Sequence, residues 1–281
     1  MSGEERAGGR APGIGRGAST GRQRAVRGAL GTAAFLAVWQ LVASPLPTYL
    51  LPTPVEVAAA FLRQLLQRAV YSLPFVGGDV TLPALVAHLL QSLQHYLPGL
   101  LIGSTLGVAL GVVVGWFVVV DDALTPVIRV LRPIPPLAWV AFAIIWFGIG
   151  HTGATFIVSI GAFWITFYNA LSGVESVDAA LLESAASLGV HDHPTILRKV
   201  VLPAASPSIF TGLRTSIGQC WMIVVAAELV GPPGVGEEIL IAAQNLALDV
   251  SIAYMLVISA VFLASDAAFR AVETEVLAWR A

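Results

Sequence analysis

The residues of this sequence that could carry chemistry are a few acids and histidines in or near long apolar segments. Glu228 and Asp266 lie close to the ends of two such segments, and an acid in apolar surroundings is costly and often functional. His191 and His193 flank Asp192, a donor set that could ligate a metal. Three donors in a row before a proline are more simply a solvated turn, so we predict no metal site.

Nucleotide hydrolysis by a phosphate-binding loop requires a lysine that is followed by serine or threonine. The single lysine, Lys199, stands between Arg198 and Val200, so a Walker A motif is impossible. We therefore predict that the chain is not an enzyme and binds no cofactor. Any ATP that drives its function must be bound by a separate partner subunit.

The composition points to a lipid environment. The chain has 281 residues, of which 57% are hydrophobic and 11% are charged, whereas a soluble domain carries about 25% charged residues. A surface that faces lipid needs no such charge. The net charge of −2 does not point to nucleic acid, and we expect no nucleic-acid partner. The single cysteine, Cys220, excludes an intrachain disulfide.

Long apolar runs predict an all-α membrane protein with about six transmembrane helices, since each run approaches the ~20 residues that cross a bilayer. The six runs cover residues 28–44, 97–120, 134–150, 152–171, 209–230 and 251–269.

Basic residues orient these spans. With the N-terminus in the cytoplasm, twelve of the 15 basic residues are cytoplasmic, Arg63 and Arg68 are outside, and Arg214 lies within the fifth span. The positive-inside rule favours this arrangement, which places both termini in the cytoplasm of a prokaryotic cell. Residues 1–27 resemble a disordered cytoplasmic tail; a signal peptide is the weaker alternative.

An outside segment, residues 45–92, is predicted between the first two spans. Thr53, Pro54 and Glu56 have the pattern of a capped helix start. Polar residues then gather on one face up to residue 70, which indicates an amphipathic helix that lies on the membrane or packs on the bundle.

Glycines recur every four residues in the second span, at Gly99, Gly103, Gly107, Gly111 and Gly115. Because four residues are just over one turn, these glycines form a groove in which another helix can pack closely; such a groove could also let helices slide during transport.

The third span begins after several prolines, so we expect it to start sharply and to be short. The third and fifth spans are predicted to line a translocation path, with five residues as candidates: Trp139, Trp146, Thr215, Gln219 and Glu228.

The longest cytoplasmic loop, residues 172–208, is predicted to form a helix, a turn and a second helix. Residues 179–188 have a helical pattern that Gly189 ends. The second helix, residues 195–201, is expected to end at Leu202 and Pro203. Small residues on the first helix, beside the single acid Glu183, form a surface on which a cytoplasmic partner could dock.

This loop resembles the EAA loop of binding-protein-dependent ABC importer permeases, through Glu183-Ser184-Ala185, Gly189 and Leu202-Pro203. Residues 51–54, 134–139, 146–150 and 226–228 are similar to the branch that carries nitrate, sulfonate, taurine and bicarbonate. Ser184 replaces the usual alanine, residues 189–203 are one residue longer than expected, and His95 stands where related permeases usually have arginine.

The resemblance implies that residues 28–281 form a permease domain for a small anionic solute. It implies ABC ATPase subunits, an extracytoplasmic solute-binding protein and a second copy of the chain as partners. The residues that would couple the chain to the ATPase are Glu183, Ala185, Ala186, Gly189, Leu202 and Pro203.

The alternative is a stand-alone secondary transporter, which would show ionisable residues or broken helices at mid-membrane in paired halves. No internal repeat and no acid at mid-span are evident in the sequence.

Overall fold

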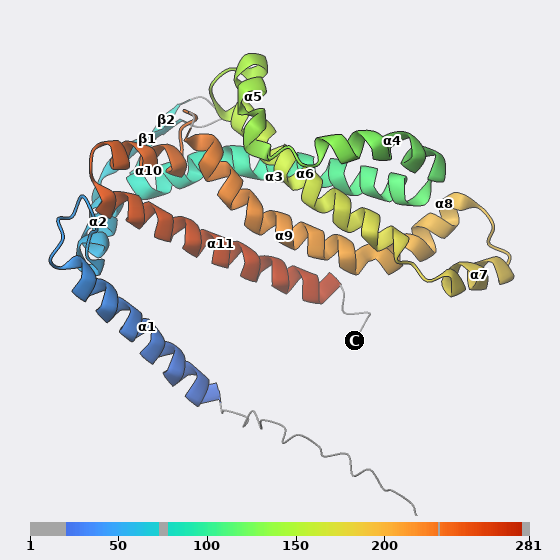
Figure 1. The fold of residues 1–281 in the computed structure, drawn as a ribbon, viewed down its shortest axis with the longest axis horizontal. Helices are drawn as coiled ribbons and strands as arrows, with labels where there is room; N and C mark the ends of the chain where they lie inside the picture. Colours follow the sequence, from blue (N-terminus) through green and yellow to red (C-terminus); the bar gives the residue numbers. More distant parts are fainter. Residues whose placement is uncertain (1–20, 73–77, 230, 277–281) are drawn as a thin grey trace, which may run out of the picture.

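The computed structural model describes residues 21–72, 78–229 and 231–276, and they form a helical bundle with a small β-hairpin at one end (Figure 1). In chain order, the first elements are α1 (Gly21–Ala43), α2 (Pro54–Leu66), β1 (Arg68–Ser72), β2 (Asp79–Pro83), α3 (Ala84–Trp116), α4 (Val118–Leu131), η1 (Pro136–Trp139) and α5 (Val140–Phe147). The others are α6 (His151–Glu175), α7 (Ala179–Ser187), α8 (His193–Ile196), the π-helical turn η2 (Leu197–Val201), α9 (Leu202–Glu228), α10 (Val235–Gln244) and α11 (Leu248–Val276).

The predicted fold class is confirmed. Within the described residues, five helices are long and apolar enough to cross a membrane, and a sixth span results if the bent pair α4 and η1–α5 is counted as one. The β1–β2 hairpin, with Ser72 opposite Asp79, was not predicted. Of the predicted tail, residues 1–20 lie outside the described residues and residues 21–27 belong to α1.

Helix α3 begins at Ala84, earlier than the apolar run at residue 97 that predicted it, so its first turns lie within the predicted outside segment. The first turns of α3 contain His88, Gln94 and His95, which interrupt the apolar run, yet His95 is fully buried by the rest of the bundle. The predicted helix start at Thr53 is confirmed, since Thr53 and Glu56 form a reciprocal capping box.

Helices α3 and α6 pack along the glycine groove. A Cβ added at Gly99 would lie 2.8 Å from the carbonyl oxygen of Thr155, and one at Gly111 would lie 2.9 Å from the Cβ of Ala170. At these distances any side chain larger than hydrogen would clash. The glycines therefore let the backbones of α3 and α6 come close together, as small residues do between membrane helices.

The third predicted span, residues 134–150, corresponds to η1 and α5, which together cover residues 136–147. The helix axis turns by 87° between α4 and this segment. Pro133, Pro135 and Pro136 lie at this break, where proline removes backbone donors and stops a helix from extending backwards. The short helix α5 therefore projects from the bundle (Figure 1).

The second loop helix continues into the next span and does not end at Leu202 and Pro203. Helix α8 passes through the π-turn η2 into α9, and the N–H of Leu202 bonds to the carbonyl oxygen of Leu197, five residues back. Pro203 follows just after the π-turn, so the wider turn lies where proline, which has no N–H to donate, interrupts the α-helical hydrogen bonds.

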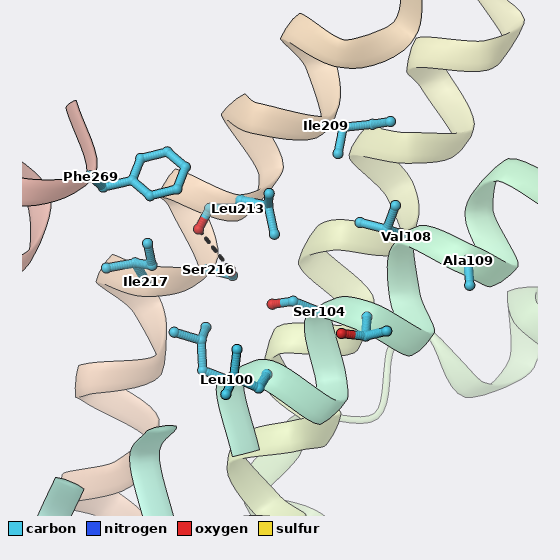
Figure 2. Close-up of a pocket in the computed structure, with 11 residues that line it drawn as sticks. Leu100, Ser104, Val108, Ala109, Ile209, Leu213, Ser216, Ile217 and Phe269 are labelled. Atoms are coloured by element: carbon cyan, nitrogen blue, oxygen red, sulfur yellow. Dashed lines mark hydrogen bonds between the residues drawn. The ribbon is translucent and has the colours of Figure 1, made fainter. Parts of the chain in front are cut away.

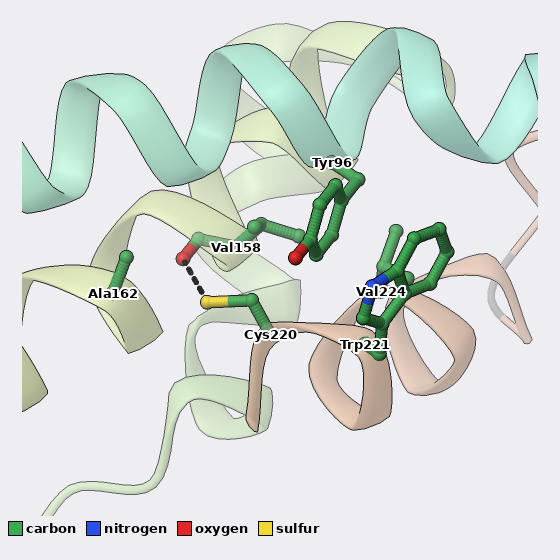
Figure 3. Close-up of a cluster of buried hydrophobic side chains, with 6 residues drawn as sticks. All are labelled: Tyr96, Val158, Ala162, Cys220, Trp221 and Val224. Carbon is green, nitrogen blue, oxygen red and sulfur yellow. Dashed lines mark hydrogen bonds between the residues drawn. The ribbon is translucent and has the colours of Figure 1, made fainter. Parts of the chain in front are cut away.

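The centre of the bundle is a buried cluster from α3, α6 and α9 (Figure 3). The ring of Tyr96 stacks on that of Trp221, with centroids 4.2 Å apart, and the Tyr96 hydroxyl donates to the carbonyl oxygen of Ile217 at 2.8 Å. Val158, Ala162, Cys220 and Val224 complete the cluster. This core joins α9 to α3 and α6 and fixes which side of α9 faces outward.

Candidate functional site

A polar groove of about 470 Å³ lies between α9 and α11. Thr211, Thr215 and Gln219 recur at four-residue spacing along α9 and are exposed on its outer side. The groove is also lined by Arg214, Gly218, Met222, Phe262, Asp266 and Glu273. Two of the predicted path residues, Thr215 and Gln219, therefore share one groove.

Arg214 and Asp266 form an ion pair in this groove, with 2.8 Å between Nε of Arg214 and Oδ1 of Asp266. Asp266 also accepts hydrogen bonds from Arg270, one turn further along α11. The two arginines compensate the cost of a carboxylate in an apolar helix, which explains why Asp266 is tolerated there.

The ion pair lies toward the end of the bundle that carries α7. A Cβ at Gly212 would meet the side chain of Asn169, and the next residue of α6, Ala170, meets Gly111 of α3. Gly111 is five residues from the end of α3 at Trp116, and Ala170 is five residues from the end of α6 at Glu175. Arg214 therefore lies about two turns from these helix ends.

A second groove, on the neighbouring side of α9, is apolar (Figure 2). Leu100, Val108, Leu213, Ile217 and Phe269 line it. Ser216 donates its hydroxyl to the carbonyl oxygen of Leu213 and adds little polarity. The polar groove is therefore a property of one side of α9 only.

Glu228 lies inside the bundle, away from this groove. Its carboxylate is fully buried, 2.5 Å from Nε2 of His95, and accepts a hydrogen bond from the backbone N–H of Gly236 at 2.6 Å. Glu228 thereby ties α9 to α3 and to the start of α10. The structure separates it from the other predicted path residues of α9.

His95 connects Glu228 to a second histidine, since its Nδ1 lies 3.1 Å from Nδ1 of His151. His95 lies outside the predicted spans and 133 residues from Glu228, so sequence spacing could not reveal this pair. A buried acid needs a hydrogen-bond donor, and His95 supplies one.

The predicted path residues Trp139 and Trp146 lie on η1 and α5. Trp146 is exposed and packs edge-on against Phe142 and Phe156. Trp139 is half-buried, and its indole nitrogen has no hydrogen-bond partner among the described residues. Segment η1 contacts both α6 and α9, so these tryptophans lie on an element next to α9 but do not line the polar groove.

The predicted coupling helix is α7, at the end of the bundle opposite the hairpin (Figure 1). Asp178 caps its start by accepting from the N–H of Ala180 at 2.9 Å. Gly189 has a φ of +82°, a left-handed conformation that favours glycine. This geometry lets the chain turn away sharply after the helix.

The outer face of α7 is partly apolar. Glu183 is exposed, as are Leu181 and Leu188, the latter at 84%. Ala185 is buried and Ala186 half-buried, so the predicted small-residue face is turned largely toward the bundle. Leu202 packs on a core cluster and Pro203 is exposed.

These features are those of a helical membrane protein, and solved structures share its fold. The inward-facing MetNI methionine ABC transporter matches with a TM-score of 0.56 and 19% identity, over 67% of this chain and 95% of the matched chain. A second match, an amino acid ABC transporter, has a TM-score of 0.53. These likenesses concern the fold.

Residues 99–277 match the family described as the binding-protein-dependent transport system inner membrane component, and the chain belongs to this family. A putative ABC transporter permease of Methanocaldococcus jannaschii is 40% identical over 70% of this chain and 74% of its own length. The putative aliphatic sulfonates transport permease SsuC of Bacillus subtilis is 32% identical over 91% and 88%. The taurine permease TauC of Escherichia coli is 35% identical over 68% and 70%.

The chain is therefore a permease subunit of an ABC importer and not an enzyme. The resemblance read from the sequence is confirmed, down to the nitrate, sulfonate and taurine branch. The alternative of a stand-alone secondary transporter is not supported. Permeases of this family work with an ATPase and a solute-binding protein.

Proposed function

We propose that two copies of this chain form the membrane passage for a small oxyanion of the sulfonate or nitrate class. In this assembly two ATPase subunits dock on the cytoplasmic loop and a solute-binding protein docks on the opposite face. The solute class is supported by the names of the relatives, which are permeases for aliphatic sulfonates, taurine and nitrate.

The main support for this passage is the polar stripe of α9, the exposed residues Thr211, Thr215 and Gln219. Thr211 and Thr215 donate to carbonyl oxygens of their own helix, but Gln219 has no hydrogen-bond partner among the described residues, and lipid offers it none. In the assembled transporter this face must therefore meet water or another protein surface. A second copy that presents the same stripe would enclose a polar path between the two subunits.

We place helix α5 where the two copies meet. It has eight residues, too few to cross the bilayer alone, and it stands off the bundle (Figure 1). We assign Trp139 and Trp146 to the wall of the passage where the two copies meet. We assign Glu228 to the support of this wall, because its carboxylate is buried within one subunit.

Helix α7 is proposed as the coupling element. Leu181 and Leu188 offer apolar contact area, and Glu183 offers a charge that can pair with a basic residue of the ATPase. Removal of one member of such a pair costs about 2–5 kcal/mol at a desolvated interface. At a solvated surface the same change costs almost nothing.

The test is uptake together with ATPase co-purification. The chain is expressed with the ATPase and binding protein encoded beside it, in cells that lack their own uptake of nitrate, taurine and ethanesulfonate. Wild-type cells should take up at least one of these anions. Glu183→Ala and Gly189→Asp should reach the membrane normally, but lose either the bound ATPase or uptake; Ser187→Ala is the matched control on α7. Normal uptake by both variants would remove α7 as the coupling element.

Orientation is tested separately, with both termini proposed to be cytoplasmic. A tag at either end should be labelled only in permeabilised cells; labelling of a terminus in intact cells would contradict this topology.

A further inference from the structure

We infer that Arg214 is an anion-binding residue inside the membrane passage, held in place by Asp266 and guarded by Glu273. This inference rests on the proposed path and names the group within it that recognises the solute. Arg214 is the basic residue of α9, and it lies in the same groove as the exposed residues Thr215 and Gln219.

The geometry leaves the end of the guanidinium group available. Its Nε donates to Asp266, and within the described residues this is the only hydrogen bond that Arg214 makes. The side chain is 38% exposed and lines the polar groove. The two terminal nitrogens form a planar fork, which matches the oxygens of a sulfonate or a nitrate.

Other groups in the groove fit the same ligand. Gln219 makes no hydrogen bond within the described part of the chain and lines the groove, so its amide N–H can donate. The hydroxyls of Thr211 and Thr215 donate to the carbonyl oxygens of Pro207 and Thr211, each at 2.8 Å. The threonines therefore make the wall polar, whereas the donors for an anion are Arg214 and Gln219.

Asp266 and Glu273 have different roles. Asp266 is shared between Arg214 and Arg270, which fixes the guanidinium and leaves Asp266 little capacity to neutralise it. Glu273 lies 3.9 Å from Nη1 of Arg214, an ion-pair separation too long for a hydrogen bond. Glu273 thus occupies the approach to the fork, and a solute anion replaces it there.

The experiment measures the local potential without requiring transport. Thr215→Cys is made in a Cys220→Ala background of the full chain assembled with its ATPase. Its reaction rates are compared for an anionic methanethiosulfonate (sulfonatoethyl) and a cationic one (trimethylammonioethyl). Arg214→Gln should lower the anionic-to-cationic rate ratio by about tenfold, since one charge about 6 Å away in water changes each rate about threefold. Glu273→Gln should raise the ratio by a similar factor.

Two further measurements complete the test. Nitrate or ethanesulfonate should slow the labelling of Thr215→Cys when Arg214 is present and not in Arg214→Gln. Ser187→Cys on α7, away from the groove, should show a rate ratio that Arg214→Gln leaves unchanged.

Three results would overturn the inference: no reaction of Thr215→Cys with either reagent, a ratio that neither variant shifts, or no protection by the anions. Failure of the wild type to import any of the three anions would instead overturn the proposed solute class, and the labelling ratios would still report on Arg214.

Discussion

Removal of the His95 side chain should leave the buried carboxylate of Glu228 without one of its two hydrogen-bond partners. Loss of one partner of a buried ion pair costs about 3–5 kcal/mol, mostly from the charge left behind. Glu228 keeps one of its two donors, the N–H of Gly236 at 2.6 Å, so we expect His95→Ala to cost about 3 kcal/mol, near the lower end. Glu228→Gln is neutral and keeps only one acceptor oxygen. That oxygen can still accept from the N–H of Gly236, so this change should cost about 1 kcal/mol.

The double variant decides whether the two residues act together. Once Glu228 is neutral, His95→Ala strands no charge, so the double variant should be about 2 kcal/mol more stable than the sum of the single changes predicts. The assay is reversible unfolding of the purified protein in mixed detergent micelles, followed by tryptophan fluorescence. His191→Ala, an exposed histidine on the 191–194 turn, is the control and should cost less than about 0.5 kcal/mol. Additive costs for the two single changes would refute the reasoning.

Three further changes test other parts of the fold. Gly103→Val should destabilise the bundle by several kcal/mol, because its Cβ would meet the backbone of α6, whereas Gly31→Val has nothing within 4 Å and should be neutral in the same unfolding assay. Thr53→Ala should cost about 1 kcal/mol through loss of the α2 cap, visible as faster hydrogen exchange in α2. The hydrogen bonds from Thr195 lower the pKa of Asp192 below its usual range, so the cap on α8 should hold near neutral pH. The cap should weaken as pH falls from the unfolded-state pKa of Asp192 through its lowered folded-state pKa. Asp192→Asn, which does not titrate, should lose this pH dependence of exchange protection; the same dependence in wild type and Asp192→Asn would contradict the prediction.

The long helices could be predicted from the sequence because lipid demands runs of about twenty apolar residues. The same criterion missed the start of α3, where His88 and His95 interrupt the run although the bundle buries this part of the helix. It also missed the 87° break before α5. The prolines indicated a sharp start there, but the direction of the chain after a break depends on tertiary packing.

Side-chain direction explains the outcome at α9. Thr215 and Gln219 are four residues apart, so they share a face. Glu228 is nine residues beyond Gln219, and at 100° per residue it points to the opposite side. Helical periodicity alone could therefore have shown that Glu228 does not share the helix face of Thr215 and Gln219. Its partner His95 could not be found in this way, since only the folded chain brings α3 and α9 together.

Segments α8, η2 and α9 form one long continuous helix. Residues His193–Glu228 form 36 residues of helix, about 54 Å at 1.5 Å per residue. One end lies beside α7, the middle carries Arg214, and the far end is anchored by Glu228. A displacement of the end beside α7 is transmitted to the groove along one helix, because no loop lies between them. The π-turn η2 and Pro207 inside α9 interrupt the regular α-helical hydrogen bonds, so their stiffness sets how much of the displacement reaches the groove.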